Sequence, residues 1–452
     1  MRLLAAAVVV TLAPWATPPR PPEEPIERAL RLVKPALVRV ETHATATVSV
    51  ATIGFDQSAL EGFARRDVAN KLASGQRYSS LAVAQQAITT DLEHEFVANP
   101  APYLKLGDRI SDPYDSARVG SGWVADGDGY VVTASDALLD EAAVTQAATD
   151  QERQTISADL DDITPGDLGL TVPFSDAQKT NLVNAALAIA VPTIHVAGVA
   201  SHTTVQLGSA VPGQESGAQV RPDARVLVDH SNRHGMGVAV LQIQGRFATI
   251  PLAYGTTLAA GAPIVVAGYP AAEAQSGGSD SGATPVAPEA VPGTVGDTIA
   301  EGGALTSTGY TLGVVGGAVL DGDGLAVGVA VKRDGASAIV PVADVVRALD
   351  EAHARVRTNA VTKDYRKAAA DMSNHWYKKA LPILQSIAKR SPDIPWVSDQ
   401  TQEAAREIAL GHDESPNDRP FFPVALAAVL FAVDAIAVTT VLRRRLLRSR
   451  AG

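Results

Sequence analysis

The chain has 452 residues, of which 46% are hydrophobic and 19% charged, with a formal net charge of −11. A chain this long and apolar can bury the cores of roughly two to four domains, which excludes a disordered, collagen-like or coiled-coil protein. The acidic balance argues against a nucleic-acid-binding protein, because phosphate backbones attract basic surfaces. With no cysteine, the chain has no disulfide framework, thiolate metal site or cysteine nucleophile.

The N-terminal residues are typical of a secretory signal. Arg2 precedes an apolar run from Leu3 to Ala13, which is close to the length of a signal-peptide core and too short to span a bilayer. We therefore expect a signal peptide over residues 1–20, and the alternative is a buried first strand or helix. The sequence does not indicate whether this segment is cleaved.

The C-terminal residues favour a membrane anchor. Residues 421–442 (FFPVALAAVLFAVDAIAVTTVL) contain Asp434 as their one charge, and a basic tail at 443–452 follows, beginning with Arg443, Arg444 and Arg445. About 20 apolar residues span the hydrocarbon, and the arginines are expected to stay cytoplasmic. The sequence thus predicts a single-pass cell-membrane protein with its main domain extracytoplasmic. Asp434 either pairs with a partner helix or is protonated or shielded within the span.

The body of the chain reads as β-structure with short strands. Residues 33–50 are rich in Val and Thr, and the motif DGDG lies between apolar runs in both 120–133 and 318–326. Asp-Gly between apolar runs is a strong hairpin signal, and Val-rich segments with Gly-rich turns favour a barrel or sandwich. Further short strands are expected at 238–243, 263–267 and 326–331.

Two long stretches break this β pattern and read as helices. They cover residues 56–98 and 137–193, and Ser175 is the expected N-cap of the last helix in the second stretch. Residues 272–296 have few bulky side chains and are expected to form a mobile loop. A helix over 341–356 closes the body.

Several of these segments together resemble the HtrA-type branch of the trypsin-like serine proteases. The matching segments, in the family's order, are GSGWVADGDGYVVTASD (120–136), GVAVLQI (237–243), PLAYG (251–255), GAPIVVAGYP (261–270), GVVGGAV (313–319) and GLAVGVAV (324–331). The resemblance implies a mainly β, two-barrel trypsin-like fold over residues 25–356, with helical insertions at about 56–98 and 137–193.

The resemblance does not extend to the catalytic residues. Hydrolysis in this family needs a hydroxyl nucleophile, an imidazole base and a carboxylate that orients the base. By the resemblance, Asp136 occupies the histidine position, Gly237 the aspartate position and Val315 the serine position. Valine has no lone pair for attack, and a carboxylate is a poor base toward serine. All three roles are vacant, which predicts a catalytically inactive pseudoprotease.

The glycines around Val315 fit a remnant of the family's peptide-groove and oxyanion loop, formed by Gly313, Val314, Gly316 and Gly317. Glycine allows backbone angles that other residues resist. A groove that binds an extended peptide without cleaving it is therefore one possibility. The other is that Val314 and Val315 fill the old pocket with apolar bulk.

Neighbouring hydroxyl and imidazole groups offer little in place of the triad. The candidates are Ser121, Ser135, Ser307, Thr308, His230 and His234. Their sequence positions do not predict a histidine next to a hydroxyl with an oxyanion hole nearby. The two histidines have the spacing of helical zinc ligands, but they precede a strand and lack a third ligand. We expect no metal site and no cofactor.

The segment 364–411 reads as a helical stalk before the membrane span. Tyr377, Ala380, Leu384 and Ile387 have the spacing of the second helix of a tetratricopeptide repeat, and Ala368 fits the first. One repeat is too short for a continuous core, so it must dock onto the body or a partner. An ordinary helical stalk is the alternative.

The whole sequence thus favours a membrane-anchored, extracytoplasmic, catalytically inactive serine-protease homologue of bacterial type that binds a peptide or protein of the envelope. The alternatives are an active trypsin-like endopeptidase with a displaced catalytic set, and a structural subunit of an envelope complex. A fold by itself does not establish an activity. The partner and the oligomeric state cannot be identified from the sequence.

Overall fold

The computed structural model describes residues 23–168, 172–209, 220–221, 224–230, 237–256, 258–270, 286–298, 305–308, 314–333 and 336–416. The chain divides into two compact units. One covers residues 33–359, and the other combines residues 1–32 with 360–452.

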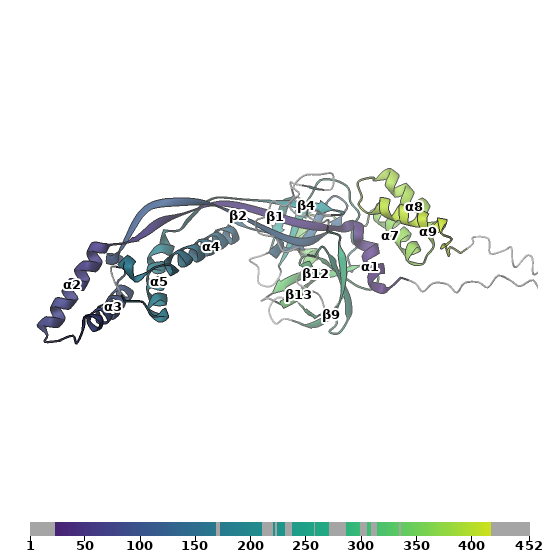
Figure 1. The fold of residues 1–452 in the computed structure, drawn as a ribbon. Coiled ribbons are helices and arrows are strands. Elements are labelled where there is room, and N and C mark those ends of the chain that lie inside the picture. The colour runs from purple at the N-terminus through teal and green to yellow at the C-terminus, as the bar shows by residue number, and fades with distance from the viewer. Residues whose placement is uncertain are drawn as a thin grey trace, which may run out of the picture. The chain divides into compact units, whose positions relative to one another are not determined.

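The first sheet of the larger unit has seven strands in the order β5-β4-β1-β2-β3-β7-β6. They are β1 (Leu37–Phe55), β2 (Leu104–Asp126), β3 (Tyr130–Ala134), β4 (His195–Leu207), β5 (Val220–Arg221), β6 (Arg225–Asp229) and β7 (Val238–Gln242). Of these, β1, β2 and β4 are labelled in Figure 1. The predicted DGDG hairpin is confirmed as the turn between β2 and β3. Gly129 has a φ of +91° there, a backbone region that favours glycine.

The strands β1 and β2 form a long antiparallel hairpin whose register runs from Leu37 opposite Trp123 to Phe55 opposite Leu104. At about 3.3 Å per residue, the 19 residues of β1 extend roughly 60 Å. The half of the hairpin close to Trp123 is buried, whereas the first half of β2 is largely exposed.

The second sheet is a closed barrel in the order β10-β13-β12-β11-β8-β9. Its strands are β8 (Pro263–Gly268), β9 (Glu289–Thr298), β10 (Leu305–Thr308), β11 (Ala318–Leu320), β12 (Ala326–Arg333) and β13 (Ala336–Pro341). Small and branched side chains such as Val266, Val319 and Ile339 fill its core. The helix α6 (Val342–Glu351) follows β13.

The expectation of a mobile loop over 272–296 was wrong for its second half, because β9 begins at Glu289 and pairs with β8. The β9 side chains have little bulk, so their sequence did not predict a strand. β9 is a strand because β8 and β10 form hydrogen bonds with it. Residues 271–285 lie outside the described part of the chain.

The two stretches predicted to be helical contain α2 (Gln57–Ala73), α3 (Leu81–Ala98), α4 (Glu141–Asp161) and α5 (Asp176–Ala190). The helices α2 and α3 connect β1 to β2, and α4 and α5 lie between β3 and β4. Ser175 is the N-cap of α5, and it forms a capping box with Gln178. Side chains from α2, α3 and α5 share one hydrophobic core that includes Leu60, Phe96 and Leu187.

The expected fold class, mainly β with two barrels and one transmembrane helix, is corrected on three points. Helical residues outnumber strand residues in the described part of the chain, because the two insertions are long. The sheets comprise one closed barrel and one seven-stranded sheet with distinct ends. Within the described ranges, no helix combines the length and the apolar character that crossing a membrane requires.

The expected single-pass membrane localisation therefore has no support in the described residues. The predicted signal peptide (1–20) and the predicted span at 421–442 lie outside the described residues. Asp434, Arg443, Arg444 and Arg445 lie outside them as well.

The smaller unit is helical. It contains α1 (Pro25–Val33) up to Leu32, α7 (Ala360–Ser373), α8 (Tyr377–Arg390) and α9 (Val397–Ala409). The positions that the repeat spacing marked as interior are buried, namely Ala368, Tyr377, Ala380, Leu384 and Ile387. This burial fits a packed helix pair, and the likeness to a tetratricopeptide repeat stays a prediction.

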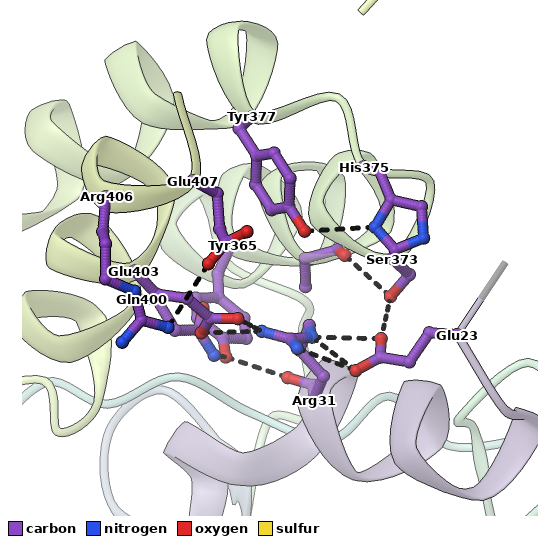
Figure 2. A network of polar contacts seen from close by, with 11 residues as sticks. Glu23, Arg31, Tyr365, Ser373, His375, Tyr377, Gln400, Glu403, Arg406 and Glu407 are labelled. Carbon is purple, nitrogen blue, oxygen red and sulfur yellow. Dashed lines mark hydrogen bonds and ion pairs between the residues drawn. The ribbon is translucent and has the colours of Figure 1, made fainter. Parts of the chain in front are cut away.

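Polar contacts join α1 to the other helices of this unit (Figure 2). The Arg31 guanidinium lies between two carboxylates, 2.7 Å from Glu23 and 3.2 Å from Glu403. Burial opposes the charge of Arg31, but the two carboxylates outweigh it and raise its pKa. The Tyr365 hydroxyl donates to the Arg31 carbonyl at 2.8 Å, so the backbone of α1 is fixed as well.

Candidate functional site

Strand pairing brings the first two expected catalytic positions together. Asp136 lies in a short 3-10 turn (Ser135–Ala137) directly after β3, and Gly237 lies directly before β7. The strands β3 and β7 pair, with Ala134 opposite Val238. The ladder continues one step further, because the Ser135 N–H donates to the Gly237 carbonyl at 2.8 Å.

The loop that carries Val315 packs against the same hairpin. The Ser121 N–H donates to the Val315 carbonyl at 2.7 Å. Gly316 has a φ of +87°, and a Cβ atom on it would lie 2.0 Å from the Ser121 carbonyl oxygen. This loop conformation and its close approach to β2 therefore require glycine at 316.

Three consecutive residues of β12 lie beside Gly316, Gly237 and Asp136, and Gly316 directly follows the expected position Val315. The Gly316 N–H donates to the Ala330 carbonyl at 2.7 Å. A Cβ atom on Gly237 would lie 3.7 Å from Val331 Cγ1. The Lys332 backbone N–H donates to the Asp136 carboxylate. Asp136, Gly237 and the loop that carries Val315 thus lie along β12.

Asp136 is exposed, and the charges of Arg118 and Lys332 act on its carboxyl group. Neighbouring atoms partly desolvate the exposed carboxyl group and raise its pKa, while the charges of Arg118 and Lys332 and the Lys332 N–H oppose this. The negative charge of Asp229 adds to the raising. Desolvation outweighs the two cations, so the surroundings as a whole disfavour the charged form of Asp136.

The two valines of the loop differ in their surroundings. Val314 is fully buried in the barrel core with Val327 and Ala330. Val315 is half-buried. Val314 therefore fills space inside the barrel, and Val315 remains partly accessible at the serine position. Gly317 donates its N–H to the Val314 carbonyl at 2.8 Å and closes the turn, whereas Gly313 lies outside the described residues.

The side chains of Ser121 and His230, two of the hydroxyl and imidazole candidates, make structural contacts. Ser121 Oγ accepts a hydrogen bond from the Tyr269 N–H at 2.8 Å and donates to the Tyr269 carbonyl at 2.9 Å. His230 Nε2 lies 3.0 Å from a Glu351 carboxylate oxygen. Ser135 is buried. His234 and the side chains of Ser307 and Thr308 lie outside the described part.

No group of three or more histidine, aspartate or glutamate side chains in the described ranges is arranged to hold a metal ion. The pair His230 and Glu351 joins a residue that follows β6 to α6. This contact ties α6 to the first sheet.

Arg118 and Lys332 are the site residues that the sequence alone did not identify. Arg118 precedes the GSG motif, and Lys332 ends the apolar run GLAVGVAV at the first charged position. The positive charge at the end of this run was the signal by which Lys332 could have been found in the sequence. Lys332 comes close to Asp136 only because the fold places β12 beside the Ser135–Ala137 turn. The sequence marks Asp229 only as a neighbour of His230, and its effect on Asp136 depends on the fold.

Similarity to known proteins is confined to solved structures. No family model matches the chain, and no curated protein matches it. The chain is similar to the crystal structure of Deg5, with 19% identity and a TM-score of 0.28, over 51% of this chain and 81% of that one. It is also similar to the crystal structure of the serine endoprotease from Yersinia pestis, with 12% identity and a TM-score of 0.33, over 74% of this chain and 68% of that one. Both TM-scores lie below 0.5, so any functional conclusion has to rest on the chain's own residues.

Proposed function

We propose that the protein is a trypsin-like, HtrA-type protease homologue that does not hydrolyse peptide bonds and instead binds a peptide or protein partner. The observation that supports this most directly is that Asp136, Gly237 and the loop that carries Val315 lie along β12. The family positions converge in space, yet these positions hold no hydroxyl and no imidazole.

The chemistry of the three side chains supports the loss of hydrolysis. Val315 cannot form an acyl intermediate, and Gly237 has no group with which to orient a base. Asp136 offers a carboxyl group in place of an imidazole, and although desolvation raises its pKa, a carboxylate is still a poor base toward a hydroxyl group. Removing a single triad member typically lowers the rate about 10⁴-fold or more, and members that act as a unit cannot be compensated one at a time.

The retained backbone supports the binding half of the proposal. Gly316 keeps a left-handed conformation against β2, and Val315 stays partly accessible. A rigid loop between two sheets can hold an extended peptide by its main chain without cleaving it. The acidic composition makes a nucleic acid an unsuitable partner.

One experiment tests both halves of this proposal. The full chain is incubated with fluorescein-labelled casein, and both fragment release and fluorescence anisotropy are followed. A fluorophosphonate probe is applied in parallel, with trypsin as the active control and Val315→Ala as the matched variant. We expect a rise in anisotropy without fragments or label, and the same for Val315→Ala.

Two results would contradict the proposal in different ways. Fragment release that survives repurification, with label on a specific serine, means that a catalytic set exists elsewhere. An anisotropy that stays at the value of free casein removes the peptide-binding half.

A further inference from the structure

The helical insertion between β1 and β2 carries apolar side chains that do not face its own core. All residues of this insertion, from 56 to 103, are described. The first turns of α2 pack into the core of the insertions through Ala59, Leu60 and Phe63. The later turns line an open hollow of about 440 Å³, formed by Ala64, Arg65, Val68, Ala69 and Leu72. The lining of this hollow is therefore mostly apolar, and neither the family motifs nor the triad positions account for it.

Exposed apolar side chains flank the loop that joins α2 to α3. Leu72 lies in the last turn of α2 and is 57% exposed, and Leu81 and Val83 lie in the first turn of α3 and are 75% and 49% exposed. Leu81 is the most exposed large apolar side chain among the described residues. Isolated apolar residues are common on protein surfaces. Three of them at one loop, beside an apolar hollow, indicate an interaction surface.

Hydrogen bonds hold this loop in a defined conformation. Gly75 has a φ of +87°, and its N–H donates to the Leu72 carbonyl at 3.1 Å. The Gln76 N–H donates to the Lys71 carbonyl at 2.9 Å. These two bonds form the Schellman ending of a helix, and Ser80 then caps the start of α3 with its hydroxyl. The backbone on both sides of the loop thus holds the apolar side chains outward, so their exposure does not come from a frayed helix end.

The charged side chains around this loop are mainly basic, in a chain whose net charge is −11. We call residues 64–83 the α2–α3 tip. The tip contains one acidic residue, Asp67, and four basic residues, namely Arg65, Arg66, Lys71 and Arg77. The local charge is therefore opposite in sign to that of the whole chain, which favours an anionic partner at this place.

The basic side chains of the tip differ in how far they are already used. Lys71 forms ion pairs with Asp67 and with Asp91 of α3, so it is not assigned a role in binding. Arg65 lines the hollow and lies 2.8 Å from Glu61, with both side chains mostly exposed. An exposed pair of this kind contributes little to stability, so Arg65 can exchange Glu61 for another anion. Arg77 is exposed within the loop itself.

The combination of projecting apolar groups and arginines fits the surface of an anionic bilayer. Segments that bind at a membrane interface bury apolar side chains near the headgroups, while their basic side chains attract anionic lipids. A side chain as exposed as Leu81 projects from the protein and does not line a closed groove. Such a group suits a fluid phase, which needs no complementary shape. A nucleic acid would match the arginines but not the apolar side chains.

We propose that the α2–α3 tip binds the surface of a bilayer that contains anionic phospholipid. The exposed apolar side chains at the loop enter the boundary between headgroups and acyl chains, and Arg65 and Arg77 contact lipid phosphates. The contact is peripheral and requires no spanning helix. It goes beyond the proposed peptide binding and does not depend on it.

The test places one environment-sensitive fluorophore in the tip of the full chain. Because the chain has no cysteine, Ser79→Cys labelled with nitrobenzoxadiazole reports on the loop alone, even if apolar segments elsewhere adhere to lipid. Ser111→Cys, at an exposed position of β2, carries the control label. Each protein is titrated with vesicles of phosphatidylcholine and with vesicles that also contain phosphatidylglycerol. We expect the label at 79 to shift to the blue with the anionic vesicles only, and the label at 111 to stay unchanged.

Variants that carry the label at 79 assign the binding to the tip. Leu81→Ser should weaken the vesicle affinity read from this label about tenfold, because it removes an apolar side chain that enters the bilayer. Arg77→Gln should weaken the affinity about fivefold, and high salt should reduce this effect. Val97→Ser and Arg28→Gln make matched changes at exposed positions outside the tip and should leave the affinity unchanged. Equal melting temperatures verify that the variants fold.

Several results would overturn the inference. The label at 79 could keep its aqueous emission with both kinds of vesicle, or it could shift equally with both, which would remove the role of the arginines. A shift that grows with protein concentration without vesicles would mean that a second copy covers the tip. A shift with casein and none with vesicles would assign the surface to a protein. The casein assay of the proposed function stands or falls separately from all of these.

Discussion

Gly316 is the residue whose backbone and packing constrain the candidate site most tightly. Its φ of +87° disfavours any other residue, and an added Cβ would lie 2.0 Å from the Ser121 carbonyl oxygen and 2.7 Å from Thr133 Oγ1. The left-handed backbone alone costs roughly 1–2 kcal/mol for an L-residue with a side chain. We predict that Gly316→Ala lowers the free energy of unfolding by at least about 2 kcal/mol, measured by urea denaturation.

Gly322 provides the matched control, because a Cβ atom there would meet nothing within 4 Å. Gly322→Ala should change the free energy of unfolding by less than about 0.5 kcal/mol, as is usual for surface substitutions. Equal effects of the two substitutions would mean that the loop around Val315 does not pack closely against β2.

Asp136 gives a prediction about pH. Its folded pKa is raised above the unfolded value of 3.8, so folding disfavours its charged form. This penalty is fully present above the folded pKa and disappears as the pH falls below the unfolded pKa. Asp136→Asn should therefore raise the urea midpoint relative to the wild type at pH 7, and this gain should vanish near pH ~3.5.

The control for this comparison is Asp161→Asn, which makes the same charge change at an exposed position. We expect it to leave the difference from the wild type small at both pH values. A loss of stability in Asp136→Asn at pH 7 would show that the attraction of Arg118 and Lys332 outweighs desolvation, and that folding lowers the pKa of Asp136 instead of raising it.

At the residue scale, the sequence indicated which residues to compare with the family's catalytic residues, but not which side chains surround them. Asp136, Gly237 and Val315 could be identified because each lies within or at the edge of a recognisable motif of the chain, such as GVVGGAV. Arg118 and Lys332 could not, because their approach to Asp136 depends on the pairing of distant strands. A linear motif carries no information about which charge a separate strand brings beside it.

Among the elements, α1 shows how a few polar contacts can fix a short helix. A nine-residue helix is marginal by itself, and Arg31 joins it to Glu23 and Glu403 (Figure 2). We predict that Arg31→Met lowers the free energy of unfolding by about 1–3 kcal/mol, because it leaves two partly buried carboxylates without their cation. Hydrogen exchange of α1 and α9 should rise together.

Arg28, which is exposed on the same helix, supplies the control. Arg28→Met should change neither the stability nor the exchange of α9. Combining Arg31→Met with Glu403→Gln in a double-mutant cycle should give a coupling above about 0.5 kcal/mol. Additive effects would refute a direct Arg31–Glu403 interaction.

Elements with strong local signals were predictable, and those stabilised by their neighbours were not. The N-cap at Ser175 and the Asp-Gly turn before β3 are local, and both predictions are confirmed. The first half of β2, around Pro113, is exposed on most residues and lacks an alternating pattern. It is a strand only because β1 supplies its hydrogen bonds. The same reason explains why β9 was missed.

For the molecule as a whole, the hydrophobic interior is divided among separate clusters. The helical insertions share the cluster around Phe96, and the closed barrel has its own around Ile339. Phe96 is 1% exposed and lies 6.2 Å from Tyr103 between ring centroids. We predict that Phe96→Ala destabilises the insertions by about 3–5 kcal/mol, with faster hydrogen exchange in α2, α3 and α5 and unchanged exchange in β8 to β13.

The reciprocal control is Ile339→Val in the barrel core, which should cost about 0.5–1.5 kcal/mol. Its effect on exchange should be confined to the barrel strands. If Phe96→Ala accelerates exchange in the barrel to the same extent, the two cores unfold as one cooperative unit and are not energetically separate.

The sequence could not reveal that the two insertions share a core, although it predicted that both are helical. Helical periodicity identifies a buried face but not the partner that covers it. Leu92 and Leu187 lie in different insertions and pack into the same cluster. The long insertions also explain why more of the described residues lie in helices than in strands. The β motifs of the body did not predict this.

The convergence of three loops on Ala330, Val331 and Lys332 has an evolutionary consequence. Under the proposed assignment, hydrolysis would require a histidine at 136, an aspartate at 237 and a serine at 315 together, and each change alone gives no benefit because a triad acts as a unit. Gly237 has a φ of +52°, so an aspartate there would be strained before the other two changes arrived. Under the same proposal, selection for hydrolysis would meet a fitness valley, whereas substitutions that refine peptide binding would be available one at a time.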